Sequence, residues 1–194
     1  VASAVLFADI KGFSKISERF PVEDVVRFIN RYLEAVTEVV VETGGEVTKY
    51  MGDCVMAHFN SGQADNALSA AVRILEVMAV IRSEAPTDAP ENSLHVGIGI
   101  DFGEVIQGNI GSSVKMDYTL LGGVVNRAQS LEKLTRMLPV SLVFSKEIKE
   151  SAIQPWDFMH LGKHKVKGKD DPMDLYSLDS PLVYLAEPAA DENH

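Results

Sequence analysis

The sequence predicts one α+β domain in which helices cover a mostly antiparallel sheet. Two observations support this fold class. Apolar segments with strand and helix periodicities follow one another in the order strand, helix, hairpin, helix, strand, which is the βαββαβ order of ferredoxin-like domains. The chain has 194 residues, of which 46% are hydrophobic, enough for one sizeable core.

The first strand is expected at residues 3–9, SAVLFAD, because this run is apolar up to a terminal acid. Gly12 and Ser14 follow at a turn that can open a helix. A long amphipathic helix is then expected from Pro21 to Gly44. Its apolar residues recur on one helical face, and glycine is a common helix stop.

A hairpin follows, with strands at residues 46–50 and 54–59. A second amphipathic helix should span Gln63 to Arg82 before a loop that contains prolines. The alternating run at residues 94–103 predicts a strand, and residues 104–109 are expected to return from it. The remaining elements expected are a helix over Val124–Met137, a strand at 141–144, a short helix from Ser145, and strands near 158–164 and 172–178.

Two acidic residues should meet at one end of this sheet. Asp9 ends the first strand, and Asp53 immediately precedes the third, which lies antiparallel beside the first in a βαββαβ domain. Adjacent carboxylates repel each other unless a cation lies between them. Mg²⁺ or Mn²⁺ would suit such a pair, and a two-metal site can promote displacement at phosphorus. The alternative is a solvated turn, since Gly and Asp are common turn residues.

Backbone groups beside the first acid could hold an anion. The N–H groups of Lys11, Gly12, Phe13 and Ser14 lie between the first strand and the following helix. A helix N-terminus of this kind can cradle phosphate oxygens.

Composition excludes several classes of function and location. The formal charge of −10 argues against non-specific binding to nucleic acid. Cys54 is the only cysteine, so no internal disulfide can form and a reducing, cytoplasmic setting is expected. The most apolar helix is interrupted by Arg73 and Glu76, so no membrane span is expected. Because the first residue is Val1 rather than Met, we expect a domain of a longer protein.

Five ordered blocks resemble the class III nucleotide cyclase catalytic domain: FADIKGFS, TKYMGDCVMAHF, GIGIDFGEVIQGNIGS, MDYTLLGGVVN and VKGK. The wording of GGEVTKYMGDCVM, MDYTLLG and LTRMLP is most similar to light-activated adenylyl cyclases, which carry a flavin-binding sensor. The GG-D/E-EF signature of the related diguanylate cyclases is absent where MGDCVM stands. We therefore expect a catalytic domain over residues 1–180, a tail or linker over 181–194, and a regulatory sensor domain outside this chain.

The resemblance implies conversion of ATP to 3′,5′-cyclic AMP and pyrophosphate. Asp9 and Asp53, helped by the carbonyl of Ile10, would hold two Mg²⁺ or Mn²⁺ ions. Lys49 and Thr119 match the pair that reads adenine. A solvated lysine and a strand threonine are the alternative reading of these two positions.

The resemblance also implies that the active site lies between two chains. Asn126 matches the residue that orients the ribose, and Lys167 matches the lysine that contacts the terminal phosphates. One protomer would supply the two aspartates and its partner would supply Lys49, Thr119 and Asn126 together with this lysine. The partner is expected to be an identical chain or another cyclase domain.

One position departs from the family pattern. Ser130 stands four residues after Asn126, where the family has an arginine that stabilises charge on the α-phosphate. Gly123 stands where the family often has aspartate. Arg127 is three residues before the serine and could reach the same phosphate. A second hypothesis is therefore a catalytically impaired domain that donates the metal ligands in a heterodimeric or tandem cyclase.

Overall fold

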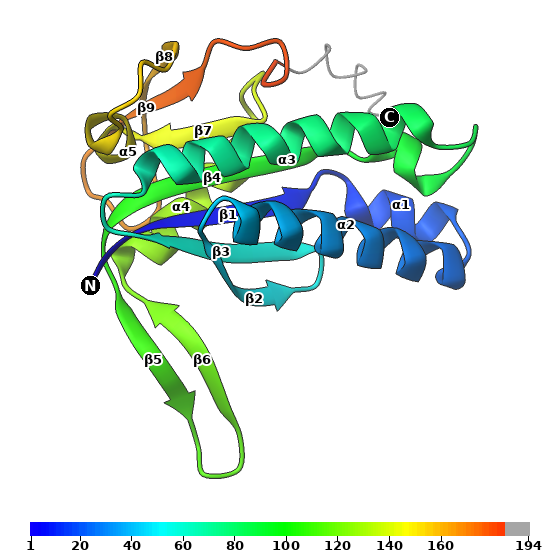
Figure 1. Ribbon diagram of the computed structural model, residues 1–194, viewed down its shortest axis with the longest axis horizontal. Coiled ribbons are helices and arrows are strands. Elements are labelled where there is room, and N and C mark those ends of the chain that lie inside the picture. The colour runs from blue at the N-terminus through cyan, green and yellow to red at the C-terminus, as the bar shows by residue number, and fades with distance from the viewer. Residues whose placement is uncertain (185–194) are drawn as a thin grey trace.

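The computed structural model describes residues 1–184 and shows a sheet between two layers of helices (Figure 1). The first half comprises β1 (Ala2–Ile10), α1 (Phe13–Arg19), α2 (Val22–Glu42), β2 (Glu46–Met51), β3 (Cys54–Asn60), α3 (Ala64–Glu84) and the 3₁₀ turn η1 (Pro90–Ser93). The second half comprises β4 (Val96–Glu104), β5 (Ile106–Gly111), β6 (Met116–Leu121), α4 (Gly123–Leu134), β7 (Leu142–Ser145), α5 (Lys146–Ser151), β8 (Phe158–His164) and β9 (Met173–Leu178).

The main sheet has seven strands in the order β2-β3-β1-β4-β7-β9-β8. β1 lies in the middle of the expected core and pairs antiparallel with both β3 and β4, whereas β4 and β7 are parallel. The predicted α+β class with its βαββαβ core is confirmed, and the last strands extend that core at one edge.

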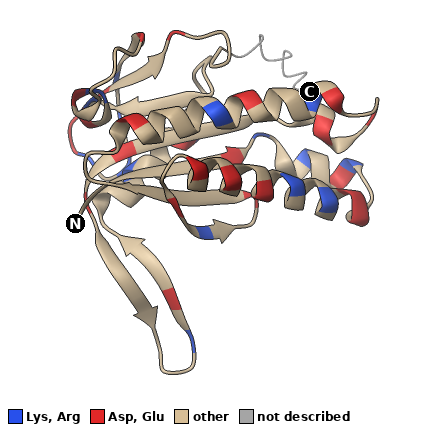
Figure 2. Ribbon diagram, in the orientation of Figure 1, with Lys and Arg blue, Asp and Glu red and all other residues tan. Residues whose placement is uncertain are grey.

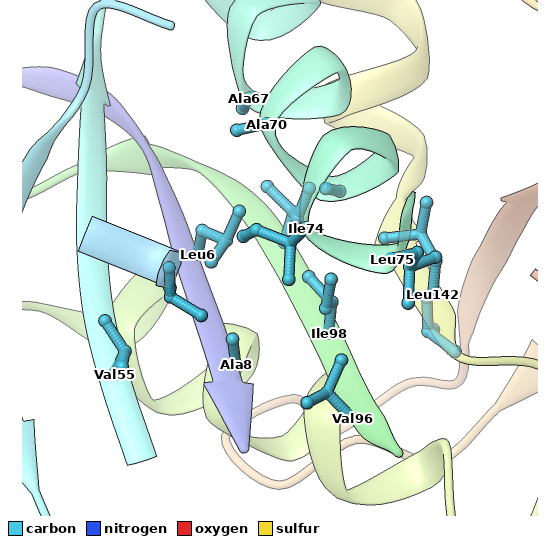
Figure 3. Close-up of a cluster of buried hydrophobic side chains, with 14 of the residues drawn as sticks. Leu6, Ala8, Val55, Ala67, Ala70, Ile74, Leu75, Val96, Ile98 and Leu142 are labelled. Carbon is cyan, nitrogen blue, oxygen red and sulfur yellow. The ribbon is translucent and has the colours of Figure 1, made fainter. Parts of the chain in front are cut away.

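The larger part of the core lies between the sheet and the long helices α2 and α3. These helices bury their apolar faces because hydrophobic residues recur at helical spacing along both. Figure 3 shows α3 side chains above the strands, with Ala67, Ala70, Ile74 and Leu75 facing Leu6, Ala8, Val55, Val96, Ile98 and Leu142. A smaller cluster fills the opposite face, under α4.

Three glycines of β4 allow α4 to lie directly on the sheet. A Cβ added at Gly97, Gly99 or Gly103 would come 2.1, 2.2 or 2.7 Å from its nearest neighbour atom, in each case an atom of α4 or its C-cap. The neighbour of Gly97 is at the C-terminal end of α4, and that of Gly103 is in its first turn. Gly97 pairs with Asp9 across the sheet, whereas Gly103 pairs with Ser3. The helix therefore points its C-terminal end toward Asp9.

The segment after β4 differs from the prediction. Residues 104–109 do not return along the preceding strand, because β5 pairs only with β6 in a separate two-stranded sheet. This hairpin projects from the body of the molecule (Figure 1). The strand β6 was not among the expected elements, and α4 ends three residues earlier than the expected Met137.

The ordered packing continues past the expected boundary at residue 180. Val183 is fully buried, and its carbonyl accepts a 2.8 Å hydrogen bond from the N–H of Ser141. Tyr184 forms a bridge with Val140. The rest of the expected tail, residues 185–194, lies outside the described residues. Among residues 1–184, no helix combines the length and hydrophobicity needed to cross a bilayer.

Candidate functional site

The fold brings Asp9 and Asp53 together at one end of the sheet. Asp9 is the penultimate residue of β1, and Asp53 lies in the tight turn between β2 and β3. Burial, followed by contact with the Asp9 carboxyl group, raises the pKa of Asp53 to about 7. Hydrogen bonds from the backbone N–H groups of Asp53 and Ile10 oppose this shift. The two carboxyl groups therefore resist being ionised side by side.

These two carboxylates fit a divalent metal ion. Asp9 Oδ1 is buried and has no hydrogen-bond partner, which is costly for an acceptor unless a cation or proton satisfies it. Within residues 1–184, no group of three or more His, Cys, Asp or Glu residues could hold a metal ion. The chain would thus supply two carboxylates and a backbone carbonyl. That donor set suits Mg²⁺ or Mn²⁺, which usually keep several ligands from water and phosphate.

An arginine that sequence reasoning missed contacts this pair. Arg136 Nη2 donates to Asp9 Oδ2 at 3.1 Å, while its Nη1 donates to Glu132 Oε1 at 2.6 Å. Glu132 is 1% exposed, and burial raises its pKa to about 6. The sequence shows only a Glu–Arg pair at helical spacing, and nothing in it connects that pair to a residue 127 positions away.

The segment after β1 forms a tight turn into α1. Gly12 has φ 68°, a left-handed conformation, and caps a helix of seven residues that begins with Phe13 and Ser14. The Lys11 side chain turns toward the end of α4, where its Nζ donates to the carbonyl of Thr135 at 3.1 Å. Burial lowers the pKa of Lys11 to about 8. Phosphate binding by this turn stays a prediction.

Lys49 and Thr119 come from β2 and from the projecting hairpin. Lys49 Nζ lies 3.7 Å from Asp117 Oδ2, and both side chains are about half exposed. Asp117 and Thr119 are two residues apart on β6, so they share one face of the strand. The structure therefore places Asp117 beside the lysine of the predicted base-reading pair. Its separation from Lys49 in the sequence hid this contact.

Asn126 and Ser130 lie on one face of α4. The hydroxyl of Ser130 donates to the carbonyl oxygen of Asn126 at 3.0 Å, and the Asn126 side chain is exposed. Arg127 has a different environment from the one expected. Its Nε donates to Asp101 Oδ2 at 2.7 Å, and Asp101 is fully buried. The ion pair holds Arg127 through Nε, and contact of this arginine with a phosphate stays a prediction.

Lys167 lies close to the N-terminal end of α4, where Asn126 is found. It is exposed in the connection between β8 and β9. A Cβ added at the neighbouring Gly168 would lie 3.9 Å from Arg127 Cγ, so this loop contacts the first turns of α4. The structure therefore places Asn126 and Lys167 in one region.

The predicted site residues form two groups, one near each end of α4. Asn126 lies eight residues before the C-terminal residue of α4, Leu134, which corresponds to about 12 Å along the helix, and Arg136 follows just beyond that end. We call the region of Asp9, Asp53 and Arg136 the aspartate end, and the region of Asn126 and Lys167 the asparagine end. Within one chain, the length of α4 thus separates the two ends.

Comparison with known proteins identifies the family. Residues 2–180 match the family described as the adenylate and guanylate cyclase catalytic domain. The chain is 32% identical to an adenylate cyclase of Anabaena cylindrica over 90% of its own length and 36% of the relative. It is 30% identical to the photoactivated adenylate cyclase subunit beta of Euglena gracilis, over 74% of this chain and 17% of that protein.

Solved structures share this fold. A bacterial light-regulated adenylyl cyclase superposes with a TM-score of 0.88 at 41% identity, covering 92% of this chain and 52% of that chain. The adenylyl cyclase CyaB from P. aeruginosa gives a TM-score of 0.80 at 27% identity, over 97% and 95% of the two chains. The chain thus spans about half of the light-regulated protein and about a third of its Anabaena relative.

Proposed function

The chain belongs to the family of adenylate and guanylate cyclase catalytic domains, and we propose that it converts ATP to 3′,5′-cyclic AMP and pyrophosphate. The observation that carries this proposal is the contact between Asp9 and Asp53, with one buried oxygen unsatisfied, at a sheet end. Relatives named adenylate cyclases support the choice of nucleotide, as do the lysine and threonine of the base-reading pair.

In this reaction the 3′-hydroxyl oxygen of ATP bonds to the α-phosphorus. The bond from that phosphorus to the bridging oxygen breaks, pyrophosphate leaves with the electron pair, and the hydroxyl proton is released. Asp9, Asp53 and the carbonyl of Ile10 would hold two Mg²⁺ or Mn²⁺ ions. When bound, such ions neutralise phosphate charge and lower the pKa of the attacking hydroxyl.

The other residues bind and orient the substrate. Lys49 would donate a hydrogen bond to a ring nitrogen of adenine, and Thr119 would face the exocyclic amine. Asn126 would hold the ribose so that its 3′-oxygen faces the α-phosphorus. Lys167 would contact the terminal phosphates and stabilise the leaving pyrophosphate. Positioning and charge stabilisation of this kind are most of what phosphoryl transfer needs from a protein.

A dimer would complete the site. The aspartate end and the asparagine end of one chain lie at opposite ends of α4, and two chains packed head to tail would bring unlike ends together twice. The β5–β6 hairpin supports such packing because it exposes apolar side chains away from the body of the molecule: Ile106, Ile110, Val114, Met116, Tyr118 and Leu121. Its only charged residues are Lys115 and Asp117 (Figure 2). We propose an identical chain as the partner.

The alternative of a catalytically impaired, metal-donating half is less favoured, because relatives named adenylate cyclases match most of the chain. Similarity to light-regulated and photoactivated cyclases leads us to propose that a flavin-binding sensor domain controls this one in the whole protein. The single cysteine fits a cytoplasmic setting.

The test is a product assay with ATP and with GTP in the presence of Mg²⁺ or Mn²⁺. Cyclic AMP should form from ATP at least about tenfold faster than cyclic GMP from GTP, because paired polar groups discriminate strongly between bases. Asp9→Asn and Asp53→Asn should abolish product, whereas Asp88→Asn, at an exposed acid far from this site in the sequence, should not. Equal use of both nucleotides, or full activity in both site variants, would contradict the proposal.

A further inference from the structure

We propose that Arg136 is a positioning residue that lowers the affinity of the aspartate end for divalent cations and holds Asp9 in place when none is bound. This inference rests on the proposed function, because it concerns the same pair of carboxylates. Arg136 lies in the segment LTRMLP, but the resemblance assigns it no role. The inference comes from its contacts alone.

Arg136 places a permanent positive charge directly beside Asp9, the residue that would bind the cation. Arg136 Nη2 lies 3.1 Å from Asp9 Oδ2, while the other oxygen, Oδ1, is left without a hydrogen-bond donor. A cation bound through Oδ1 would thus share the carboxylate with a guanidinium group that is always protonated. Repulsion between two charges a few ångström apart weakens cation binding, most strongly where burial limits screening.

Glu132 determines how strongly the Arg136 charge acts on Asp9. Its Oε1 accepts a 2.6 Å hydrogen bond from Nη1 of Arg136, so one guanidinium bridges two carboxylates. The Glu132 side chain is 2% exposed, whereas that of Arg136 is 38% exposed. The buried carboxylate therefore fixes the arginine beside Asp9 and neutralises part of its charge.

Loss of the Arg136 charge and loss of the Glu132 charge should change the cation affinity in opposite directions. Removing the arginine charge should tighten binding of a divalent cation. Removing the Glu132 charge leaves the arginine uncompensated beside Asp9 and should weaken binding. A merely structural role predicts the same sign for both changes, since each breaks the same bridge between α4 and β1. The two variants thus separate electrostatic control from support of the fold.

The experiment measures Mn²⁺ binding without nucleotide, by titration of the free-ion electron paramagnetic resonance signal at pH 8. Arg136→Gln should bind Mn²⁺ on the order of tenfold more tightly than the wild type. Arg136→Lys keeps the charge and should stay within about threefold of the wild type. Glu132→Gln should bind more weakly. The matched control is Arg31→Gln on α2, where an arginine faces Glu91 at 3.9 Å, and its affinity should not change.

Melting temperatures of the metal-free variants show whether each one folds. If Glu132→Gln does not fold, the comparison of Arg136→Gln with Arg136→Lys still decides the question. Unchanged or weaker binding in Arg136→Gln overturns the inference, as does equal tightening in Arg136→Lys. If the wild type binds Mn²⁺ and Asp9→Asn does not, the metal site stands whatever the arginine variants show. If the wild type does not bind, the metal site and the inference both fail.

Discussion

Ser130 is the residue that separates this chain most clearly from the pattern of its family. A serine cannot supply positive charge to the α-phosphate, and the hydroxyl here is directed back to the carbonyl of Asn126. Losing one such contact typically lowers the rate on the order of 10²-fold. We therefore predict that Ser130→Arg raises kcat by one to two orders of magnitude, measured as cyclic AMP formed at saturating ATP.

The control is Gln129→Arg, which adds the same side chain one position earlier and therefore about a quarter-turn around the helix. It should leave kcat near the wild-type value. A rate that does not respond to Ser130→Arg would mean that this position does not face the α-phosphate. Arg127 is paired with Asp101 through Nε, so Ser130→Arg would add a guanidinium group that this ion pair does not hold.

Single residues show where sequence reasoning reached its limit. The proximity of Asp9 and Asp53 followed from strand order alone, because antiparallel neighbours bring defined ends together. The contacts of Arg136 and Asp117 could not be predicted in the same way. Both depend on how α4 and the hairpin pack against the sheet, and side-chain contacts between distant segments leave no periodic signal in the sequence.

Among the elements, α4 carries Asn126 and is held by a buried ion pair. Arg127, in its first turns, is paired with the fully buried Asp101 of β4. We predict that Arg127→Met destabilises the protein by about 3–5 kcal/mol in denaturant unfolding, because it leaves a buried carboxylate without its partner. The double variant Asp101→Leu/Arg127→Met should recover most of this loss, since two apolar side chains leave no charge unpaired.

Arg31→Met serves as the comparison for this prediction. Arg31 lies in a half-exposed, 3.9 Å pair with Glu91, and its loss should cost no more than about 0.5 kcal/mol. If Arg127→Met were as stable as Arg31→Met, the pair with Asp101 would not anchor the helix. The double variant also has a catalytic readout. If the ion pair positions Asn126, the double variant should regain stability while its cyclic AMP formation stays reduced.

Long periodic elements were predicted well, and the hairpin was not. The helices α2 and α3 and the strands of the core bury one face each, so their apolar residues repeat with a clear period. In the β5–β6 hairpin the apolar residues are exposed: Ile106 is 70% and Val114 94% exposed. The spacing of these apolar residues therefore does not mark a face that is buried within one chain. A strand that packs on another molecule cannot be recognised from alternation toward its own core.

At the scale of the whole molecule, the exposed hairpin and the divided site point to the same assembly. Leu120 anchors the hairpin in the smaller core cluster, whereas most of its other apolar side chains are exposed and could be covered by a second chain. Charged substitutions on its apolar face, such as Met116→Asp, should shift the protein to monomers in sedimentation experiments. Because each half-site would then lack its counterpart, activity should be lost together with the dimer.

The sharpest test of a shared site is complementation between two inactive chains. Asp9→Asn removes a metal ligand at the aspartate end, and Asn126→Ala removes the ribose contact at the asparagine end. In a head-to-tail dimer of one chain of each kind, one site carries both lesions and the other carries none. Equal co-expression gives mixed dimers as half of the population, so cyclic AMP formation should return to about a quarter of the wild-type rate.

The matched control combines Asp9→Asn with Asp53→Asn. These lesions lie in the same half-site, so every site contains one of them and no activity should return. Equal recovery in both mixtures, or in neither, would mean that the aspartates and Asn126 do not meet across an interface between two chains.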